Sequence, residues 1–322
     1  MSWRHSSSSS FDHIVAFRKP DGKKKRLSFD HFQSNKKKTQ FSNQLFVKRY
    51  RETMPEGPET LKQVDFLLSL FSARLEEYQF VGLEVLSDRF PNLNLNALKR
   101  ALDLPLQDIF CKGKNYFIKL SQDVFLSAHH GMDGWWTNEA GDKNAHIKLS
   151  FARYEYTDGE ITDILEEVDI WFVNLRFGQF EIGLGQEKLQ DKLDELASGF
   201  IGRFLLTQAD WDRAVSGFGP KKKVRDALMD QYCLCSGLGN YLLCEILYVA
   251  KLHPNALFSK MTKQQKRNLF QICLDVVVGH YSGGRKKQIY KQKVAPCGEE
   301  IVAQVFGQRT AHWVPTVQTI GV

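Results

Sequence analysis

The stretch Cys235-Ser236-Gly237-Leu238-Gly239-Asn240-Tyr241 separates two segments of helical hydrophobic periodicity, 224–235 and 239–252. Glycines permit tight turns and close backbone approach, and the start of a helix leaves backbone N–H groups without internal partners. Asn240 adds a side-chain donor at that start. The pattern predicts two helices joined by a tight turn, at which a phosphate group could bind. A plain interhelical turn without a ligand fits the same residues.

Helical periodicity continues on both sides of this turn, and a long segment at 262–281 stops at Gly283-Gly284, a usual C-terminal signal. Two shorter helices are expected at 189–197 and 208–215. Short β-like runs at 300–306 and 312–318 then predict a hairpin that presents Arg309 at its tip.

The N-terminal half has a different pattern. An amphipathic helix is predicted at 58–78, with Pro58 suited to its first turn. Short β-prone runs separated by turn residues follow, as in an antiparallel sandwich or barrel. These runs cover 116–120, 124–128, 146–156 and 170–180. The expected fold class is α+β, with an N-terminal β-sandwich and flanking helix, then a helical domain and a hairpin.

The net charge of +7 conceals three blocks of different sign. Residues 1–53 hold 13 basic and 4 acidic residues, 54–200 hold 14 and 25, and 201–322 hold 17 and 8. The first block is rich in Ser and Lys and poor in aliphatic residues, so we expect a disordered extension. The last block combines positive charge with hydrophobic periodicity, which predicts a folded domain with a basic face. A solvated basic surface without a partner is the alternative.

The composition also excludes some classes of protein. There is no uninterrupted apolar run of membrane-spanning length and no hydrophobic secretion signal. The six cysteines include no C-x-x-C pair and lie mostly in apolar segments, so they are expected to be reduced thiols of an intracellular protein.

Four motifs, in this order, resemble those of the Fpg/Nei family of DNA glycosylases, and the resemblance runs from Met54 to about Gln318. The first is Met54-Pro55-Glu56-Gly57-Pro58-Glu59. The second pairs Lys112-Gly113-Lys114-Asn115-Tyr116 with His129-His130-Gly131-Met132-Asp133-Gly134. The others are 230–254, with its Gly-Leu-Gly-Asn core, and Gln308-Arg309-Thr310. The expected domains are a catalytic sandwich at 54–185, a helix–two-turn–helix domain at 186–284 and a finger-like hairpin at 285–322.

The resemblance implies a bifunctional glycosylase and AP lyase that excises oxidised bases without a cofactor. Pro55, as an N-terminal residue, would attack the sugar C1′ of a flipped nucleotide, and the resulting iminium would permit β,δ-elimination. Glu56 would act as general acid and base. Lys114 would contact the phosphate beside the lesion.

The same resemblance implies DNA-binding roles for four further residues. Asn240 and Arg309 would hold the flanking phosphates, while Met132 and Phe177 would fill the space that the flipped base leaves. Each has a structural alternative, such as core packing for Met132. Glu245, inside the helix after the Gly-rich turn, is expected to play a structural role at helix N-termini.

Three features depart from the family pattern. Pro55 is internal in the 322-residue chain, so its nitrogen is acylated; the active protein is therefore expected to begin at Met54 or to be processed there. Only Cys297 remains where zinc-finger relatives have two C-x-x-C pairs, which predicts a zincless finger and no metal. Leu175 replaces an arginine that would read the base opposite the lesion.

Only 11 residues separate Gly284 from Pro296, which leaves little room for a long lesion-capping loop. The expected preference is therefore for oxidised pyrimidines and ring-opened purines. The expected partner is damaged double-stranded or single-stranded DNA, bound by a monomer inside the cell, in the nucleus if the source is eukaryotic. The alternative is a non-catalytic relative that binds damaged or single-stranded DNA while its proline stays internal.

Overall fold

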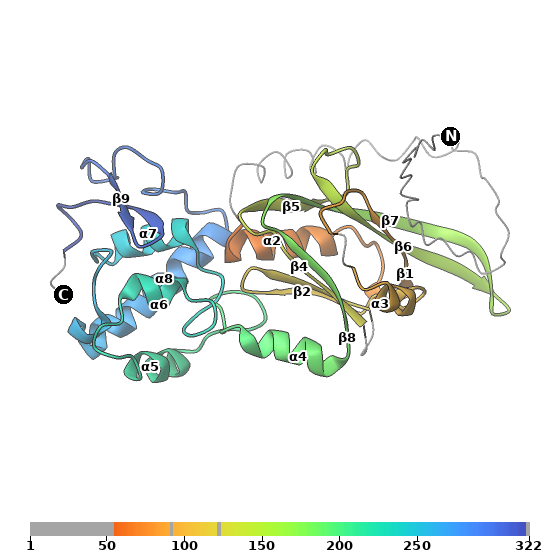
Figure 1. Ribbon diagram of the computed structural model, residues 1–322, viewed down its shortest axis with the longest axis horizontal. Helices are drawn as coiled ribbons and strands as arrows, with labels where there is room; N and C mark the ends of the chain where they lie inside the picture. The colour runs from red at the N-terminus through yellow and green to blue at the C-terminus, as the bar shows by residue number, and fades with distance from the viewer. Residues whose placement is uncertain (1–54, 91–92, 121–123, 320–322) are drawn as a thin grey trace, which may run out of the picture.

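The computed structural model describes residues 55–90, 93–120 and 124–319. The predicted N-terminal extension, 1–53, lies outside this part of the chain. Figure 1 shows a β-rich half and a helical half side by side, joined where helix α2 (Gly57–Leu68) points at the helical half. Within the described residues, no helix is both long enough and apolar enough to cross a membrane.

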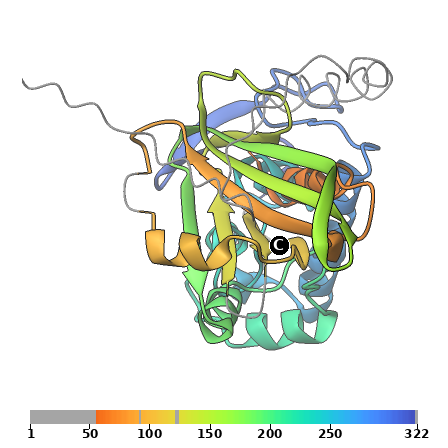
Figure 2. The same ribbon diagram turned by 90° about the vertical axis from the view of Figure 1, so that its right-hand side faces the viewer.

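The β-rich half consists of two antiparallel four-stranded sheets. The first has the strand order β1 (Tyr78–Val85), β6 (Ala145–Thr157), β7 (Glu160–Arg176) and β5 (Asp133–Thr137). The second has the order β2 (Asp108–Lys112), β3 (Asn115–Lys119), β4 (Val124–His129) and β8 (Gln179–Leu184). Buried side chains of both sheets, among them Phe80, Phe151, Ile118 and Leu126, belong to one core. The sheets therefore form the predicted sandwich, and Figure 2 shows it end-on.

The alternation of side chains along β3 explains how the second sheet is covered on both faces. Tyr116 and Ile118 point into the sandwich core, while Phe117 between them packs with Leu189 and Leu193 of helix α4 (Gln186–Glu195). Successive side chains of a strand alternate between faces, so one short apolar run serves two cores. The helix α3 (Leu95–Ala101) and the short 3₁₀ turn η1 (Leu75–Glu77) complete this half.

The helical half has a core of its own, centred on the buried Trp211, Leu242 and Phe270. Its elements are α5 (Gln208–Ser216), α6 (Val224–Met229), α7 (Asn240–Val249), the 3₁₀ turn η2 (Phe258–Lys260) and α8 (Lys263–Tyr281). Strands β9 (Val302–Phe306) and β10 (Arg309–Trp313) form the final hairpin. The α+β fold class is thus confirmed, whereas the domain boundaries at 185 and 284 stay predictions.

Several element limits differ from the sequence prediction. The helix expected at 58–78 ends at Leu68, because the chain then turns so that the Tyr78 hydroxyl accepts the backbone N–H groups of Ser72 and Ala73. The helix expected at 224–235 ends at Met229. Arg309 was predicted at a hairpin tip, but it is the first residue of β10 and pairs with Phe306.

Two predicted strands were also wrong in extent. The run 170–180 is broken at Phe177, whose φ of 59° ends β7 and starts a turn into β8. The last strand ends at Trp313, because Val314 N–H donates to the Gln318 side chain instead of to a neighbouring strand. In both places a local turn, absent from the hydrophobic pattern, interrupts a β-prone run.

Glu245 has the structural role that was predicted, but with different partners. Its buried carboxylate accepts the backbone N–H groups of Gln288, Ile289 and Tyr290 at 2.9 to 3.1 Å, in the segment between α8 and the hairpin and not at a helix start. This single side chain fixes that segment against α7.

We expect Glu245→Gln to lower the free energy of unfolding by about 2–4 kcal/mol, because the amide loses the charge and turns an NH₂ group toward N–H donors. Urea denaturation checks this. Glu187→Gln, on the exposed face of α4, is the matched control and should change stability by less than about 0.5 kcal/mol. Equal stability of both variants would contradict the assignment.

Candidate active site

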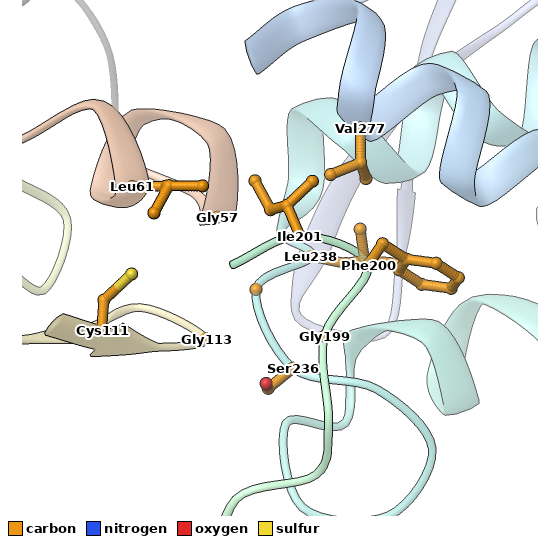
Figure 3. Close-up of a pocket in the computed structure, with 11 residues that line it drawn as sticks. Gly57, Leu61, Cys111, Gly113, Gly199, Phe200, Ile201, Ser236, Leu238 and Val277 are labelled. Carbon is orange, nitrogen blue, oxygen red and sulfur yellow. The ribbon is translucent and has the colours of Figure 1, made fainter. Parts of the chain in front are cut away.

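The two halves meet where α2 and α7 begin. Gly57 N–H donates to Gly237 O at 2.7 Å, and a Cβ added to Gly57 would lie 3.3 Å from Gly237 Cα. The turn between β2 and β3 approaches the same place, since a Cβ on Gly113 would meet the Ser236 side chain at 2.8 Å. Figure 3 shows a pocket at this junction, with residues of the β-rich half on one side and residues of the helical half on the other.

Glu56 lies at the centre of the junction and is 2% exposed. Its carboxylate accepts three backbone N–H groups at the start of α7: Gly239 at 2.8 Å, Tyr241 at 3.0 Å and Leu242 at 3.2 Å. The N-terminus of a helix presents unpaired N–H groups and a partial positive charge, which suit a carboxylate. A residue of the β-rich half thus caps a helix of the other half.

The electrostatics of Glu56 are set by competing effects. Burial raises the pKa of its carboxyl to about 7, while the ammonium of Lys114 and the α7 N–H groups lower it. Glu59, one turn further along α2, raises it. A carboxyl with this pKa exchanges a proton near neutral pH, as a general acid and base must.

Pro55 directly precedes this carboxylate and is buried. Its position is fixed through the next residue, because Glu56 N–H donates to the Glu59 carboxylate at 3.1 Å and Glu56 O accepts from the Thr60 hydroxyl at 2.9 Å. In the 322-residue chain the nitrogen of Pro55 is part of a peptide bond. Released as an N-terminus, it would be a secondary amine held beside a protonatable carboxyl.

Lys114 and Arg309 are far apart in the sequence, and both lie near the start of α7, close enough for their charges to interact. Lys114 follows the Gly113 turn, whose φ of 61° suits glycine. Burial and the nearby Arg309 lower the pKa of Lys114, while Glu56 raises it. Asn240 is the first residue of α7, and its amide donates to Thr310 O at 2.8 Å, while its Oδ1 has no hydrogen-bond partner among the described residues. The structure therefore brings Pro55, Glu56, Lys114, Asn240 and Arg309 into one site.

Met132 and Phe177 lie in two adjacent loops. Met132 N–H donates to Arg176 O at 3.2 Å, and Phe177 is 70% exposed. Asn115, His129 and Gln179 are aligned at one end of the second sheet, so the loops that follow His129 and precede Gln179 project from the end that carries Lys114. Leu175, 41% exposed, lies near the end of β7, two residues before Phe177, and its side chain offers no hydrogen bond.

Three further residues complete the site, and the sequence pattern had predicted no role for them. His129 lies near Lys114. Burial of the imidazole lowers its pKa most, and the charge of Lys114 lowers it further. Glu59 and Tyr241 are buried, and the Tyr241 hydroxyl donates to both Glu59 oxygens at 2.7 and 2.8 Å. All three stood in the quoted motifs, but only the tertiary contact between α2 and α7 reveals what Tyr241 touches.

The hairpin region was predicted to be a zincless finger that holds no metal. Among the described residues, no cluster of three or more His, Cys, Asp or Glu side chains is arranged to hold a metal ion. Cys297 is exposed, and a hydrogen bond from Tyr248 lowers the pKa of its thiol. A zincless finger stays a prediction.

No family model matches the chain. The chain is 24% identical over 296 residues to the formamidopyrimidine-DNA glycosylase of Ligilactobacillus salivarius, which covers 84% of the chain and 97% of the relative. It is 27% identical over 214 residues to the protein of that name from Mycoplasma genitalium, covering 65% and 69%. The chain is therefore similar to the Fpg/Nei family of DNA glycosylases. The resemblance carried by the four motifs is thereby confirmed.

The Fpg/Nei fold is also found among solved structures. Lactococcus lactis formamidopyrimidine-DNA glycosylase, non-covalently bound to DNA that contains an AP site, superimposes with a TM-score of 0.64 at 19% identity, covering 82% of this chain and 99% of that one. A further relative by sequence is human endonuclease 8-like 2, which is 29% identical over 116 residues, covering 33% of this chain and 35% of the relative. These matches support the general function of a DNA-repair glycosylase.

We expect the contribution of Glu56 to the stability of this protein to fall as pH rises from about 5 to 8. Buried histidines such as His130 and His280, whose pKa values burial lowers, contribute in the opposite direction, so the Glu56 part is the difference between wild type and Glu56→Gln. The folded pKa of Glu56, about 7, exceeds the ordinary value of 4.5, so the folded state retains a proton that the unfolded state releases. The contribution of Glu56 to the free energy of unfolding is complete below the unfolded pKa of 4.5 and is lost as pH rises through 7. It amounts to about 3 kcal/mol.

Urea denaturation between pH 5 and 8 measures this dependence. Glu56→Gln should remove most of it, whereas Glu195→Gln, at an exposed carboxylate, is the matched control. The same change of stability with pH in the wild type and in Glu56→Gln would show that Glu56 does not retain a proton in the folded protein over this range.

Proposed function

We propose that this chain is a bifunctional DNA glycosylase and AP lyase whose nucleophile is the amine of Pro55. The observation that carries the proposal is the buried Glu56 carboxyl beside Pro55, with a pKa of about 7 and three α7 N–H groups on its oxygens. A nucleophile next to a group that can give and take a proton is the arrangement that glycosidic substitution requires.

The proposed reaction begins when the Pro55 lone pair attacks C1′ of the flipped nucleotide. The C1′–base bond breaks, and the base leaves with the bonding electrons and takes up a proton. Glu56 gives a proton to the sugar ring oxygen as the C1′–O4′ bond opens, which leaves an iminium between Pro55 and C1′. This cation accepts the electrons released when a proton leaves C2′, so the 3′ phosphate departs by β-elimination. Loss of a further proton, from C4′, expels the 5′ phosphate by δ-elimination, and water then hydrolyses the iminium to free Pro55.

The remaining site residues suit the binding of a bent DNA backbone. Lys114, Asn240 and Arg309 offer two cations and an amide around the α7 start, a place where phosphates bind well. Met132 and Phe177 offer apolar side chains at the loop tips, suited to fill the space of a flipped nucleotide. The partner that we propose is therefore damaged DNA inside the cell, bound without a metal.

The acylated nitrogen of internal Pro55 has no lone pair for attack, so we propose that the active protein begins at Pro55. A chain that starts at Met54 and loses its methionine should form a stable adduct with DNA containing an abasic site when borohydride reduces the iminium. The uncleaved 322-residue chain should bind the DNA but form no adduct. Gel electrophoresis of labelled DNA measures both.

Variants sharpen this trapping experiment. Pro55→Gly should lose the adduct with damaged-base DNA, and Glu56→Gln should lower base excision by about 10²–10⁴-fold. Pro220→Gly, at an exposed proline of the helical half, is the matched control. No adduct from the processed protein, with DNA binding intact, would favour the non-catalytic binding relative.

The preferred lesion is proposed to be an oxidised pyrimidine or a ring-opened purine. The short segment after α8 supports this preference, because Glu245 holds its backbone and Ile289 is completely buried, leaving little free chain to cap a base. Leu175 offers no donor to the opposite base.

We expect selective excision of oxidised pyrimidines and ring-opened purines from a panel of duplexes that each carry one lesion, with less than about tenfold variation when the opposite base is changed. Initial rates on labelled duplexes measure this. Leu175→Arg should increase the variation with the opposite base, while Leu95→Arg, at an exposed site outside these loops, should not. Strong selective excision of 8-oxoguanine would overturn the proposed preference.

A further inference from the structure

Tyr241 joins the two carboxylates of the site. Its backbone N–H donates to Glu56 Oε1 at 3.0 Å, and its hydroxyl donates to the Glu59 carboxylate at 2.7 and 2.8 Å. Tyr241 is 1% exposed and Glu59 is 9% exposed, so water is largely kept from these contacts. One residue of α7 therefore contacts both acidic residues at the start of α2.

Glu59 in turn holds the backbone beside Pro55. Its Oε2 accepts Glu56 N–H at 3.1 Å, and that N–H belongs to the peptide group formed by the carbonyl of Pro55. A line of two hydrogen bonds thus runs from the Tyr241 hydroxyl through Glu59 to the peptide that follows Pro55. The Glu56 side chain does not supply this contact, because its oxygens are directed to α7.

The charges around Glu59 make the hydroxyl important. Burial raises the pKa of Glu59, whereas the Tyr241 hydroxyl, the Glu56 N–H and the charge of Lys287 lower it. Lys287 reaches the site over the Tyr241 ring, 4.4 Å from its centre. Without the hydroxyl, the buried Glu59 carboxylate would lose the side-chain donor that contacts both of its oxygens, at a cost that favours protonation or rotation of Glu59. A rotated Glu59 would release the Glu56 N–H.

We propose that Tyr241 is a positioning residue for the reaction: its hydroxyl fixes Glu59, which holds the Glu56 N–H and so aligns the Pro55 nitrogen for attack. This inference rests on the function proposed above. A purely structural role is the alternative, because the ring packs edge-on against His280 and near Tyr290. Phenylalanine keeps the ring and removes only the hydroxyl, so it separates the two roles.

In the chain that begins at Pro55, Tyr241→Phe should lower the rate of borohydride-trapped adduct at saturating DNA by about ten- to a hundredfold. The dissociation constant for DNA with an abasic-site analogue should change less than about twofold, since Tyr241 is buried. Tyr248→Phe is the matched control. It removes a hydroxyl from the same helix, and that hydroxyl contacts Cys297. An unchanged trapping rate in Tyr241→Phe would reject the inference.

A double-mutant cycle tests whether Tyr241 acts through Glu59. Glu59→Gln keeps one oxygen to accept the Glu56 N–H, and adding Tyr241→Phe to it should lower the rate less than about twofold further. A full additional loss would show that Tyr241 acts by another route, which would overturn the proposed line of contacts.

A measurement without turnover completes the test. In carbon-13 NMR of glutamate carboxyls, the Glu59 resonance is the one lost in Glu59→Gln, and Tyr241→Phe should raise its titration midpoint, because the hydroxyl lowers the pKa of Glu59. An unchanged midpoint would reject the positioning role of Tyr241 and leave the proposed function standing. Absence of adduct from the unmutated processed protein would instead reject the proposed function, and the alignment of Pro55 with it.

Discussion

The contact between the Glu56 carboxylate and the first N–H groups of α7 is the interaction on which the site depends. It satisfies a buried acid of the β-rich half with helix donors of the other half, so neither half completes the site alone. Removing either partner would leave buried polar groups unpaired, which is costly in a low-dielectric interior. The same contact determines where Pro55 lies, because Pro55 directly precedes Glu56 in the chain.

This contact requires that backbones approach one another closely, which explains the glycines at the junction. A Cβ on Gly239 would lie 2.3 Å from Glu56 Oε1 and 2.7 Å from Lys114 Nζ. Gly237 has a φ of 92° and would place a Cβ 3.3 Å from Gly57 Cα. A side chain at Gly239 would displace the Glu56 carboxylate and the Lys114 ammonium, and a side chain at Gly237 would press on the backbone of Gly57. Glycine is therefore a requirement of the chemistry as well as of the turn.

Charge is distributed in a way that the total does not reveal. Around Glu56 the useful positive charges are Lys114 and Arg309, placed by the β2–β3 turn and by the start of β10. Lys287 adds a third over the Tyr241 ring. A few placed cations near a helix N-terminus attract phosphates without a basic surface over the whole protein. The acidic composition of 54–200 is consequently compatible with DNA binding at one edge.

The sequence by itself determined the α+β class, the helices of the C-terminal half and the residue types of the site. These follow from periodicity and from short motifs in which Pro55, Glu56, Lys114, Asn240 and Arg309 stand at characteristic places. Helices such as α8 are local structures whose start at Thr262 and stop at Ser282 are coded by nearby capping residues, so a sequence window contains most of the signal.

Only the tertiary structure decided the break at Phe177, which depends on one unusual backbone angle, and the partners of Glu245, which lie in a segment distant in sequence. It also decided the link from Tyr241 to Glu59, which lie 182 residues apart. Hydrogen bonds between buried side chains are set by how two halves pack, and hydrophobic periodicity carries no record of that packing.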